Sequence, residues 1–415
     1  MPMAPRRLQD SAHPAVLHLN LTRFRNYRAL RLALPDQPLF FYGPNGAGKT
    51  NLLEAVSFLT LGTGLRRAKL AEIAHKNADH WGLVARIGFP PLADRIEIRT
   101  GITAQAPSKR LLQLNDAPLS HQAALLTYLS VVWMAPQMNR FFYDGGSYRR
   151  RFLDQTVSLY APAHRAHLSR YERALRERTA LLTRDPGQST WCDSLETTLA
   201  EVGTTIAATR LDVIRRLHLL LEGEAIAPLS PCHLHLTGQI EDSLHNRSAL
   251  EVEEAFARQL REDRVTDIHS AQQGHSARCG PHRSTFDLSL KRARGTIPGM
   301  QGSTGEQKAM ILALALATAS LLHQQTGRAP ILLLDDALAH LDQANRAALL
   351  TYVRHRVGQT WMTGTTASRS KDFARLQVGE GTVTLGGTHR KSTNKPAKRP
   401  RPIALNKRSG KQLGE

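Results

Sequence analysis

The chain has 415 residues, 41% of them hydrophobic, which is enough for two domains with packed cores. It carries 55 Lys and Arg against 35 Asp and Glu, for a net charge of +20, and this balance favours a polyanionic partner. Nucleic acid is the first candidate and an acidic membrane surface the second, while a merely soluble basic protein is the alternative. Its three cysteines, Cys192, Cys232 and Cys279, form no C-x-x-C pair, so neither a zinc ribbon nor a disulfide framework is indicated and a cytoplasmic protein is expected.

Short alternating or apolar runs predict a sheet in the first quarter of the chain. Residues 1–13 contain two arginines but no apolar segment after them, so no secretory signal is expected. The predicted strands cover residues 16–21, 30–34, 39–42, 84–89 and 95–99. The run 39–42 is apolar throughout, which is typical of a buried strand.

A glycine-rich loop follows this buried strand. Residues 43–50 read Gly-Pro-Asn-Gly-Ala-Gly-Lys-Thr and fit the phosphate-binding pattern G-x-x-x-x-G-K-[ST]. A helical pattern opens at Asn51, so the free N–H groups and dipole of a helix N-terminus would face the phosphates. Lys49 would reach the β- and γ-phosphates and Thr50 would ligate Mg²⁺. A chance match in a glycine-rich turn is the alternative, and the flanking strand and helix disfavour it. The residues predicted to contact the nucleotide are Gly43, Pro44, Asn45, Gly46, Ala47, Gly48, Lys49 and Thr50.

The middle of the chain is predominantly helical. Apolar residues recur at three- and four-residue spacing over 161–184 and 195–222, with Asp-Pro-Gly at 185–187 between them, which predicts two long helices in a separate lobe. We expect an α/β fold: an ATPase domain made of residues 1–135 and 280–387, and an inserted, mostly helical lobe at 136–279. Strands are predicted again at 233–236 and 285–290. Residues 388–415 carry nine Lys and Arg, one acid and three prolines, and are predicted to be a disordered basic tail.

Two more segments extend the nucleotide-binding pattern. Residues 331–336 read Ile-Leu-Leu-Leu-Asp-Asp, a buried strand ending in two carboxylates. Asp335 suits Mg²⁺ binding and Asp336 suits orientation of an attacking water. Upstream, Gly-Ser-Thr-Gly-Glu-Gln-Lys at 302–308 precedes a long helix predicted over 306–325, whose apolar part is a buried helix rather than a membrane span. Ser303 or Thr304 would cap that helix, and in the functional interpretation Ser303 contacts a γ-phosphate held by a second subunit.

The order of these motifs resembles the RecF family, a branch of the ABC-type ATPases related to SMC (structural maintenance of chromosomes) proteins, over roughly residues 16–385. Segments that match this family lie at 21–27, 149–154 (Arg-Arg-Arg-Phe-Leu-Asp), 280–283 (Gly-Pro-His-Arg), 302–308 (the signature) and 331–342 (Walker B and D-loop). Asp336 stands where many ABC proteins carry Glu, and Thr363 and Thr365 stand where relatives carry a switch histidine.

The resemblance implies a set of roles. ATP and Mg²⁺ would be the cofactors, and ATP would drive a homodimer in which Ser303 closes over the partner's nucleotide, with Gln137 as the Q-loop residue. The dimer would clamp double-stranded DNA near junctions with single-stranded DNA, together with RecR- and RecO-type mediators, and help to load a recombinase in repair and replication. Lys49, Asp336 and Ser303 would support weak ATP hydrolysis.

The candidate DNA contacts are four arginines, Arg149, Arg150, Arg151 and Arg283, for which helix-start or intramolecular pairing is an equal alternative.

Three rival functions share some of these features. A transporter ATPase subunit shares the motifs, but a basic tail and a long helical insertion are not what docking to a permease requires. An SMC-like arm would need long sustained heptads, which residues 147–279 lack. A nuclease would need further clustered carboxylates for two metal ions. The eighteen histidines show no metal-ligand spacing.

Overall fold

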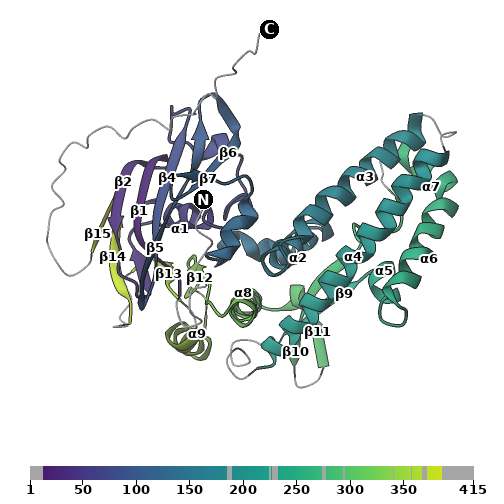
Figure 1. Ribbon diagram of the computed structural model, residues 1–415. Coiled ribbons are helices and arrows are strands. Elements are labelled where there is room, and N and C mark those ends of the chain that lie inside the picture. The colour runs from purple at the N-terminus through teal and green to yellow at the C-terminus, as the bar shows by residue number, and fades with distance from the viewer. Residues whose placement is uncertain are drawn as a thin grey trace, which may run out of the picture.

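The structure is a computed structural model, and it describes residues 13–184, 189–223, 226, 232–272, 277–292, 295–339, 341–356, 358–366 and 372–385. Two parts are visible in Figure 1: a body with two large sheets, and an elongated helical lobe that projects from it. The basic tail predicted for 388–415 and the turn predicted at 185–187 lie outside the described residues.

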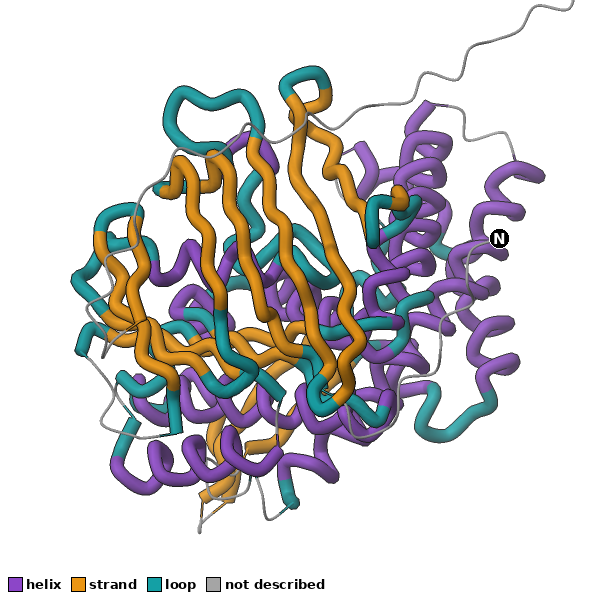
Figure 2. Tube along the Cα trace, turned by 60° about the vertical axis from the view of Figure 1, so that its left-hand side comes forward, coloured by secondary structure: helices purple, strands orange, loops and turns teal. Residues whose placement is uncertain are grey.

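One large sheet is antiparallel and has six strands in the order β2-β1-β4-β5-β6-β7. Leu19 and Leu21 of its strand β1 are buried while Asn20 between them is exposed, so side chains alternate between a core face and a solvent face. Figure 2 shows these long strands side by side across the front of the body. The strands are β1 Ala15–Phe24, β2 Tyr27–Ala33, β4 Trp81–Phe89, β5 Leu92–Thr103, β6 Ala106–Leu114 and β7 Ala117–Pro118, with short 3-10 turns η1 Leu70–Ile73 and η2 Gln122–Thr127.

The second large sheet has the order β15-β14-β3-β13-β12-β8, and all its neighbouring pairs are parallel except β14–β15. Its strands are β3 Leu39–Tyr42, β8 Val131–Met134, β12 Ile331–Leu334, β13 Thr360–Gly364, β14 Ala374–Gly379 and β15 Thr382–Leu385. Ile331 and Leu333 belong to the core shared with the antiparallel sheet, whereas Leu332 and Leu334 belong to the core on the opposite face. Both faces of β12 are buried, which explains its uninterrupted apolar run.

Helices cover both faces of this parallel sheet. α1 (Lys49–Ser57) packs against β8, β12 and β13 in the core that also holds the antiparallel sheet. α8 (Thr304–Thr326) and α9 (Gln343–Arg356) pack on the other face. By length and composition α8 could cross a membrane, yet 72% of its most apolar window is buried within the protein. A helix that is apolar on all sides is expected in a core, and the predicted buried helix is confirmed.

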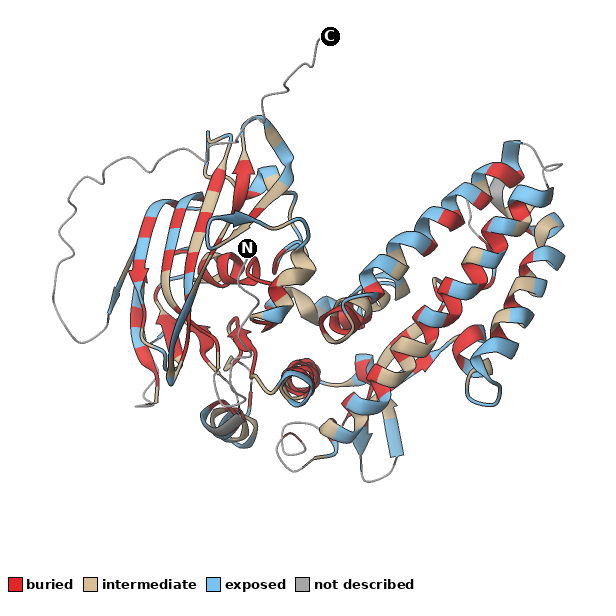
Figure 3. Ribbon diagram, in the orientation of Figure 1, coloured by how far each residue is buried: buried red, intermediate tan, exposed pale blue. Residues whose placement is uncertain are grey.

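The lobe consists mainly of helices, and Figure 3 shows buried stripes along their facing sides. They are η3 Pro136–Phe142, α2 Gly146–Tyr160, α3 His164–Arg184, α4 Ser189–Leu221, α5 Gln239–Ser243, α6 Ala249–Glu262 and α7 Arg264–Gln272. α3 and α4 confirm the two long helices predicted from spacing. Helices α3, α4, α6 and α7 enclose a hydrophobic core of their own.

A small third sheet lies at the base of the lobe, in the order β11-β10-β9. It pairs β9 (Cys232–Thr237) with β10 (Thr285–Arg292), and β10 with β11 (Gly295–Pro298), before the 3-10 turn η4 (Gly299–Gln301). The predicted ATPase domain resumes at residue 280, yet the first strands after that residue pair with a strand of the predicted insertion. The pairing of β9 with β10 depends on hydrogen bonds between distant segments of the chain, and local sequence patterns do not predict such pairing.

Candidate nucleotide-binding site

The glycine-rich loop adopts a conformation that demands glycine at two positions. Gly43 and Gly48 have φ values of +153° and +108°, in the region that side-chain-bearing residues rarely adopt. A Cβ atom on Gly43 would lie 2.2 Å from the carbonyl oxygen of Val378, and one on Gly48 would lie 2.5 Å from Nδ2 of Asn26. The loop joins β3 to α1, as predicted, and α1 begins at Lys49.

A cavity of about 350 Å³ lies over this loop and at the carboxyl ends of β12 and β13. In a parallel sheet these strand ends meet at one edge, which is the usual place for a ligand. The loop, the Walker B carboxylates and the segment after β13 all contribute to the cavity wall. Its lining includes Asn45, Gly46, Gly48, Lys49, Thr50, Asn51, Arg66, Pro136, Asp335, Asp336, Thr363, Gly364 and Thr365.

Asp335 forms the acidic centre of this cavity. Its carboxylate is buried and accepts hydrogen bonds from Oγ1 of Thr50 at 2.8 Å and from Oγ1 of Thr363 at 2.7 Å. Burial raises the pKa of Asp335, because the charged form is desolvated, while the two hydroxyl donors oppose that shift. A carboxylate beside a threonine hydroxyl is a set of hard oxygen donors, and it fits Mg²⁺.

Asp336 is held in a different way. Its φ is +52°, a left-handed conformation that Asp tolerates better than most residues. Its N–H donates to Oγ1 of Thr363 at 2.8 Å, and its carbonyl oxygen accepts from Nζ of Lys308 in α8. The backbone at the end of β12 is thus fixed from two sides, and Asp336 lines the cavity.

The ammonium group of Lys49 lies over the loop. Nζ donates to the carbonyl oxygens of Gly43 at 2.7 Å and Pro44 at 2.9 Å. Burial lowers the pKa of Lys49, and the nearby carboxylates of Asp335 and Asp336 oppose that shift. An ammonium group at this place is positioned to bind phosphate oxygens that enter the cavity.

Three residues that support the site received no role from the motifs. Nδ2 of Asn26 donates to the carbonyl oxygen of Ala47 at 3.1 Å, and the hydroxyl of Tyr27 donates to that of Gly48 at 3.2 Å. Arg66 lines the cavity and donates to Glu54 at 3.0 Å. Asn26 and Tyr27 end the segment 21–27, which matches the family, and this match is the sequence feature that could have indicated their role. Arg66 lies in a loop with no local pattern.

Gln137 and Ser303 lie away from the cavity wall. Nε2 of Gln137 donates to the carbonyl oxygen of Leu65 at 3.3 Å, and Gln137 lines a neighbouring cavity instead. Ser303 caps α8 as predicted: its hydroxyl accepts from the N–H of Glu306 at 3.3 Å, and Oε2 of Glu306 accepts from the N–H of Ser303 at 2.8 Å. Ser303 is exposed and does not line the nucleotide cavity of its own chain.

All four arginines predicted to contact DNA make intramolecular contacts. Arg149 pairs with Asp287 at 2.9 Å, Arg150 donates to the carbonyl oxygen of Ser284 at 2.9 Å, and Arg283 donates to that of Ala277 at 3.2 Å. Arg151 is exposed and donates to the carbonyl oxygen of Ser147, one turn earlier in α2, at 3.2 Å. Arg149 and Arg150 are partly buried, whereas Arg151 and Arg283 are exposed, so the DNA contact remains a prediction for all four residues.

The segments 149–154 and 280–283 are joined by one buried arginine. Arg210 of α4 donates to both carboxylate oxygens of Asp154, at 2.8 and 2.9 Å, and to the carbonyl oxygen of Pro281 at 2.7 Å. These two segments, which carried the family resemblance, thus meet through a hydrogen-bonded network at the base of the lobe.

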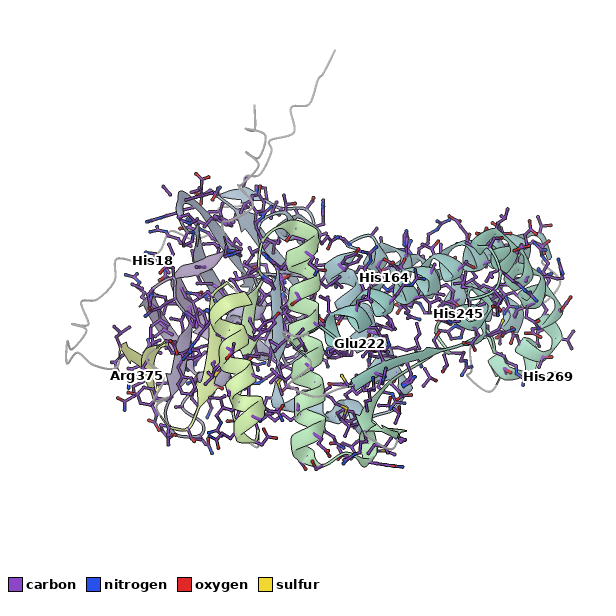
Figure 4. All side chains as sticks on the ribbon, turned by 90° about the horizontal axis from the view of Figure 1, so that it is seen from below. His18, His164, Glu222, His245, His269 and Arg375 are labelled. Carbon is purple, nitrogen blue, oxygen red and sulfur yellow. The ribbon has the colours of Figure 1, made fainter. Side chains whose placement is uncertain are left out.

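Within the described part of the chain, no group of three or more His, Cys, Asp or Glu side chains could hold a metal ion. Figure 4 shows His164, His245 and His269 spread along the lobe.

Comparison with known proteins identifies the family. The family model described as the RecF/RecN/SMC N terminal domain matches residues 15–376. A protein from Agrobacterium fabrum named DNA replication and repair protein RecF is 39% identical over 352 residues, covering 84% of this chain and 92% of the relative. A protein of the same name from Brucella suis biovar 1 is 38% identical over 353 residues, covering 85% and 90%.

Solved structures agree in fold. A structure described as the recombination mediator protein RecF with ATP in the RecFOR pathway has a TM-score of 0.77 at 22% identity, covering 90% of this chain and 99% of that one. An Smc head domain from Pyrococcus furiosus has a TM-score of 0.50 at 16% identity, covering 90% and 96%. The predicted fold, an α/β ABC-type ATPase with a helical lobe, is confirmed, and the chain belongs to the RecF family within the RecF/RecN/SMC group.

Proposed function

We propose that this protein is an ATP-dependent DNA-binding protein of recombinational repair and replication. ATP would dimerise it, and the dimer would clamp double-stranded DNA near junctions with single-stranded DNA. The names of its relatives, DNA replication and repair protein RecF, support the biological setting. RecR- and RecO-type mediators, recombinase loading and a cytoplasmic location are part of the same proposal.

The observation that carries this proposal is the contrast between a built nucleotide cavity and an exposed Ser303. Thr50 and Asp335 are joined within one chain, whereas Ser303 does not line that cavity and faces solvent. In this proposal the signature segment of one subunit meets the nucleotide held by another. A nucleotide between two copies then becomes part of the interface, and its binding free energy stabilises the dimer.

Within each site the residues would divide the work. Residues 43–50 would hold the phosphates with backbone N–H groups, and Lys49 would pair with the β- and γ-oxygens. Thr50 and Asp335 would hold Mg²⁺, which when bound neutralises charge that develops on the phosphates. Asp336 would orient water for attack. Because its side chain is one methylene shorter than that of Glu, we expect hydrolysis to be slow, which suits a switch.

The electrostatic field of the chain supports a DNA partner independently of the motifs. A net charge of +20 lets Lys and Arg replace counterions condensed on DNA, so binding should depend strongly on salt and weakly on base sequence. A clamp formed by dimerisation would add a topological hold to this attraction.

Lys49→Ala tests the proposal, because it removes the phosphate-binding ammonium group at the cavity. DNA affinity would be measured by fluorescence anisotropy with and without ATP, on plain duplex and on duplex with a single-stranded overhang. Light scattering would follow the mass of the complex. We expect ATP to produce a dimer and tighter binding in the unaltered chain, and neither effect in Lys49→Ala.

Lys109→Ala is a matched control, since Lys109 is exposed on β6 and its substitution removes the same charge as Lys49→Ala. It should retain the response to ATP. If the unaltered chain stayed monomeric and bound DNA equally with and without ATP, the proposed clamp would be wrong. Turnover of many ATP molecules per second would contradict slow hydrolysis alone.

A further inference from the structure

A second cavity, of about 470 Å³, adjoins the nucleotide cavity and shares Arg66 with it. Its lining comes from the loop 63–67 after α1, from Trp133 of β8, and from η3 with the start of α2. Four guanidinium groups line it, those of Arg66, Arg67, Arg140 and Arg151. A ligand bound here would touch the ATPase body and the base of the lobe together.

The positive charge in this cavity is only partly balanced. Arg66 pairs with Glu54 at 3.0 Å, and Arg140 pairs with Asp144 at 3.2 Å. For the other two arginines, Arg67 and Arg151, the described residues provide no carboxylate partner. Their unmatched charge would be offset by a bound anion.

The contacts that Arg67 and Arg151 do make are with neutral groups. Arg67 donates to the amide oxygen of Gln155 at 2.9 Å, and Arg151 donates to the carbonyl oxygen of Ser147 at 3.2 Å. The pKa of Arg67 is lowered, first by desolvation and then by the positive charge of Arg151, while Tyr148 opposes the shift. Each guanidinium group retains further N–H donors for a ligand, because a guanidinium group has five.

The backbone and an aromatic ring hold Arg67 in place. Its φ is +55°, a left-handed conformation that is uncommon for residues other than glycine and that persists only where surrounding structure fixes it. Its guanidinium group lies over the ring of Tyr148, 5.5 Å from the ring centroid. The charge is therefore positioned by the fold, and is not carried on a freely moving side chain.

We propose that this cavity binds the phosphate backbone of DNA, with Arg67 and Arg151 as the principal contacts and Arg140 at its margin. The inference rests on the proposed DNA-binding function and assigns part of it to named residues. Phosphate oxygens suit this site because planar guanidinium groups bind them through paired N–H donors. Such contacts fix the position of DNA without reading its sequence.

The location of the cavity also suggests how nucleotide binding could be coupled to DNA binding. Arg66 lines both cavities, so a change in its position on nucleotide binding alters the charge presented to the backbone phosphate. A coupling of this kind is reciprocal. DNA bound at Arg67 and Arg151 would change the affinity for ATP by the same factor by which ATP changes the affinity for DNA.

The test compares two double variants with equal loss of charge. Arg67→Gln with Arg151→Gln removes the two principal contacts. Arg31→Gln with Arg95→Gln is the control, since both residues are exposed on strands of the antiparallel sheet and neither forms an ion pair within the described residues. DNA affinity is measured by anisotropy with ATP, on the duplex with an overhang, over a series of salt concentrations.

We expect the cavity variant to bind DNA about tenfold more weakly, or worse, because two charge-assisted contacts are lost. The slope of log K against log salt should fall by about 0.9 for each contact removed. The control should keep nearly the affinity of the unaltered chain, and thermal unfolding should show both variants folded. Equal affinities for the cavity variant and the control would overturn the assignment.

Further readouts separate this inference from the proposed function. If the unaltered chain shows no ATP-stimulated DNA binding, the proposed function fails and the cavity assignment fails with it. If that chain responds normally and the cavity variant does as well, only the assignment fails. A titration with ATP should give one bound nucleotide per chain for the unaltered chain and for the cavity variant. If the unaltered chain bound a second nucleotide and the cavity variant did not, the cavity would be a site for free nucleotide. If the cavity variant lost dimerisation but kept its DNA affinity, the cavity would be part of a protein contact.

Discussion

Thr50 and Asp335 are 285 positions apart in the chain, yet the hydroxyl of Thr50 donates a 2.8 Å hydrogen bond to the carboxylate of Asp335. The sheet explains this proximity, since β3 and β12 both lie parallel to β13, one on each side of it. Their carboxyl ends therefore share an edge, where the phosphate-binding loop and the Walker B carboxylates meet. The proposed Mg²⁺ site depends on this strand order.

Thr363→Val should weaken the site and the fold together. The Thr363 hydroxyl donates to Asp335 and accepts from the N–H of Asp336, so valine leaves both buried groups without that partner. We expect the free energy of unfolding to fall by about 1–3 kcal/mol. Urea denaturation measures this change, and calorimetry should show weaker binding of ATP with Mg²⁺. Thr384→Val is the control, because Thr384 is exposed on β15 and does not line the nucleotide cavity, and an equal loss there would contradict this role of Thr363.

Asp336→Asn should separate nucleotide binding from hydrolysis. The amide keeps the shape of the side chain but cannot accept a proton from water. We expect the rate of phosphate release to fall about 100-fold or more, while ATP-induced dimerisation remains. Single-turnover phosphate release and light scattering measure the two effects. An unchanged rate would show that another group orients the water.

Arg178→Met should unfold or loosen the lobe. Arg178 is buried between Glu196 at 2.9 Å and Asp267 at 2.7 Å. Its loss leaves the buried carboxylate of Asp267 without its cation, while Glu196 keeps only its pairing with Arg264. We expect a loss of about 3–5 kcal/mol in the free energy of unfolding, measured by urea denaturation.

Arg170→Met, on the same helix, is the matched control for this prediction. Arg170 pairs with Glu201 at 3.0 Å, and about half of each side chain is exposed, at 53% and 52%. Solvent screens such a pair, so the change should stay within about 1 kcal/mol. Equal effects of the two substitutions would mean that burial does not decide the contribution of these pairs.

His282→Gln should reduce the acid sensitivity of the protein. Burial lowers the pKa of His282 to about 4, where its ring contacts the Tyr171 hydroxyl at 2.8 Å and the Ala277 carbonyl oxygen at 2.9 Å. Between about pH 6.5 and pH 4 the unfolded chain takes up a proton that the folded chain does not, so stability falls as pH falls through this window.

The contribution of His282 amounts to a loss of about 2 kcal/mol between pH 7.5 and pH 5, which His282→Gln should remove. Urea denaturation at the two pH values measures it. His245→Gln is the control, because His245 is exposed and its replacement should leave the pH dependence unchanged. If His282→Gln kept the full pH dependence, other groups would be responsible for it.

Local patterns predicted much of the fold and the centre of the site. The strands at β1, β2 and β3, the helices α3, α4 and α8, and the cap at Ser303 were all expected from residue spacing or capping chemistry, and all are present. These features depend on residues close together in the chain. The pairing of β9 with β10 across the predicted boundary at residue 280 depends on distant segments, and local patterns carry no information about it.

The arginines at the start of α2 also show the difference between what local sequence predicts and what contacts with distant residues decide. Arg149, Arg150 and Arg151 are consecutive and chemically identical, so the sequence alone does not distinguish them. Helix α2 turns them in different directions, so that Arg149 meets Asp287 and Arg150 meets the carbonyl oxygen of Ser284, while Arg151 stays exposed. Arg67, which follows no motif, joins Arg151 only because the loop 63–67 and α2 line the same cavity.

By itself the sequence predicted the nucleotide-binding segments of this protein, because a phosphate-binding loop, a pair of carboxylates after an apolar strand and a capped helix each consist of contiguous residues. The tertiary structure alone decided which charged groups remain available to a ligand. Availability depends on the neighbours that folding supplies: a carboxylate within hydrogen-bond distance balances the charge of a guanidinium group, whereas a guanidinium group that contacts only neutral oxygens can also bind an anion.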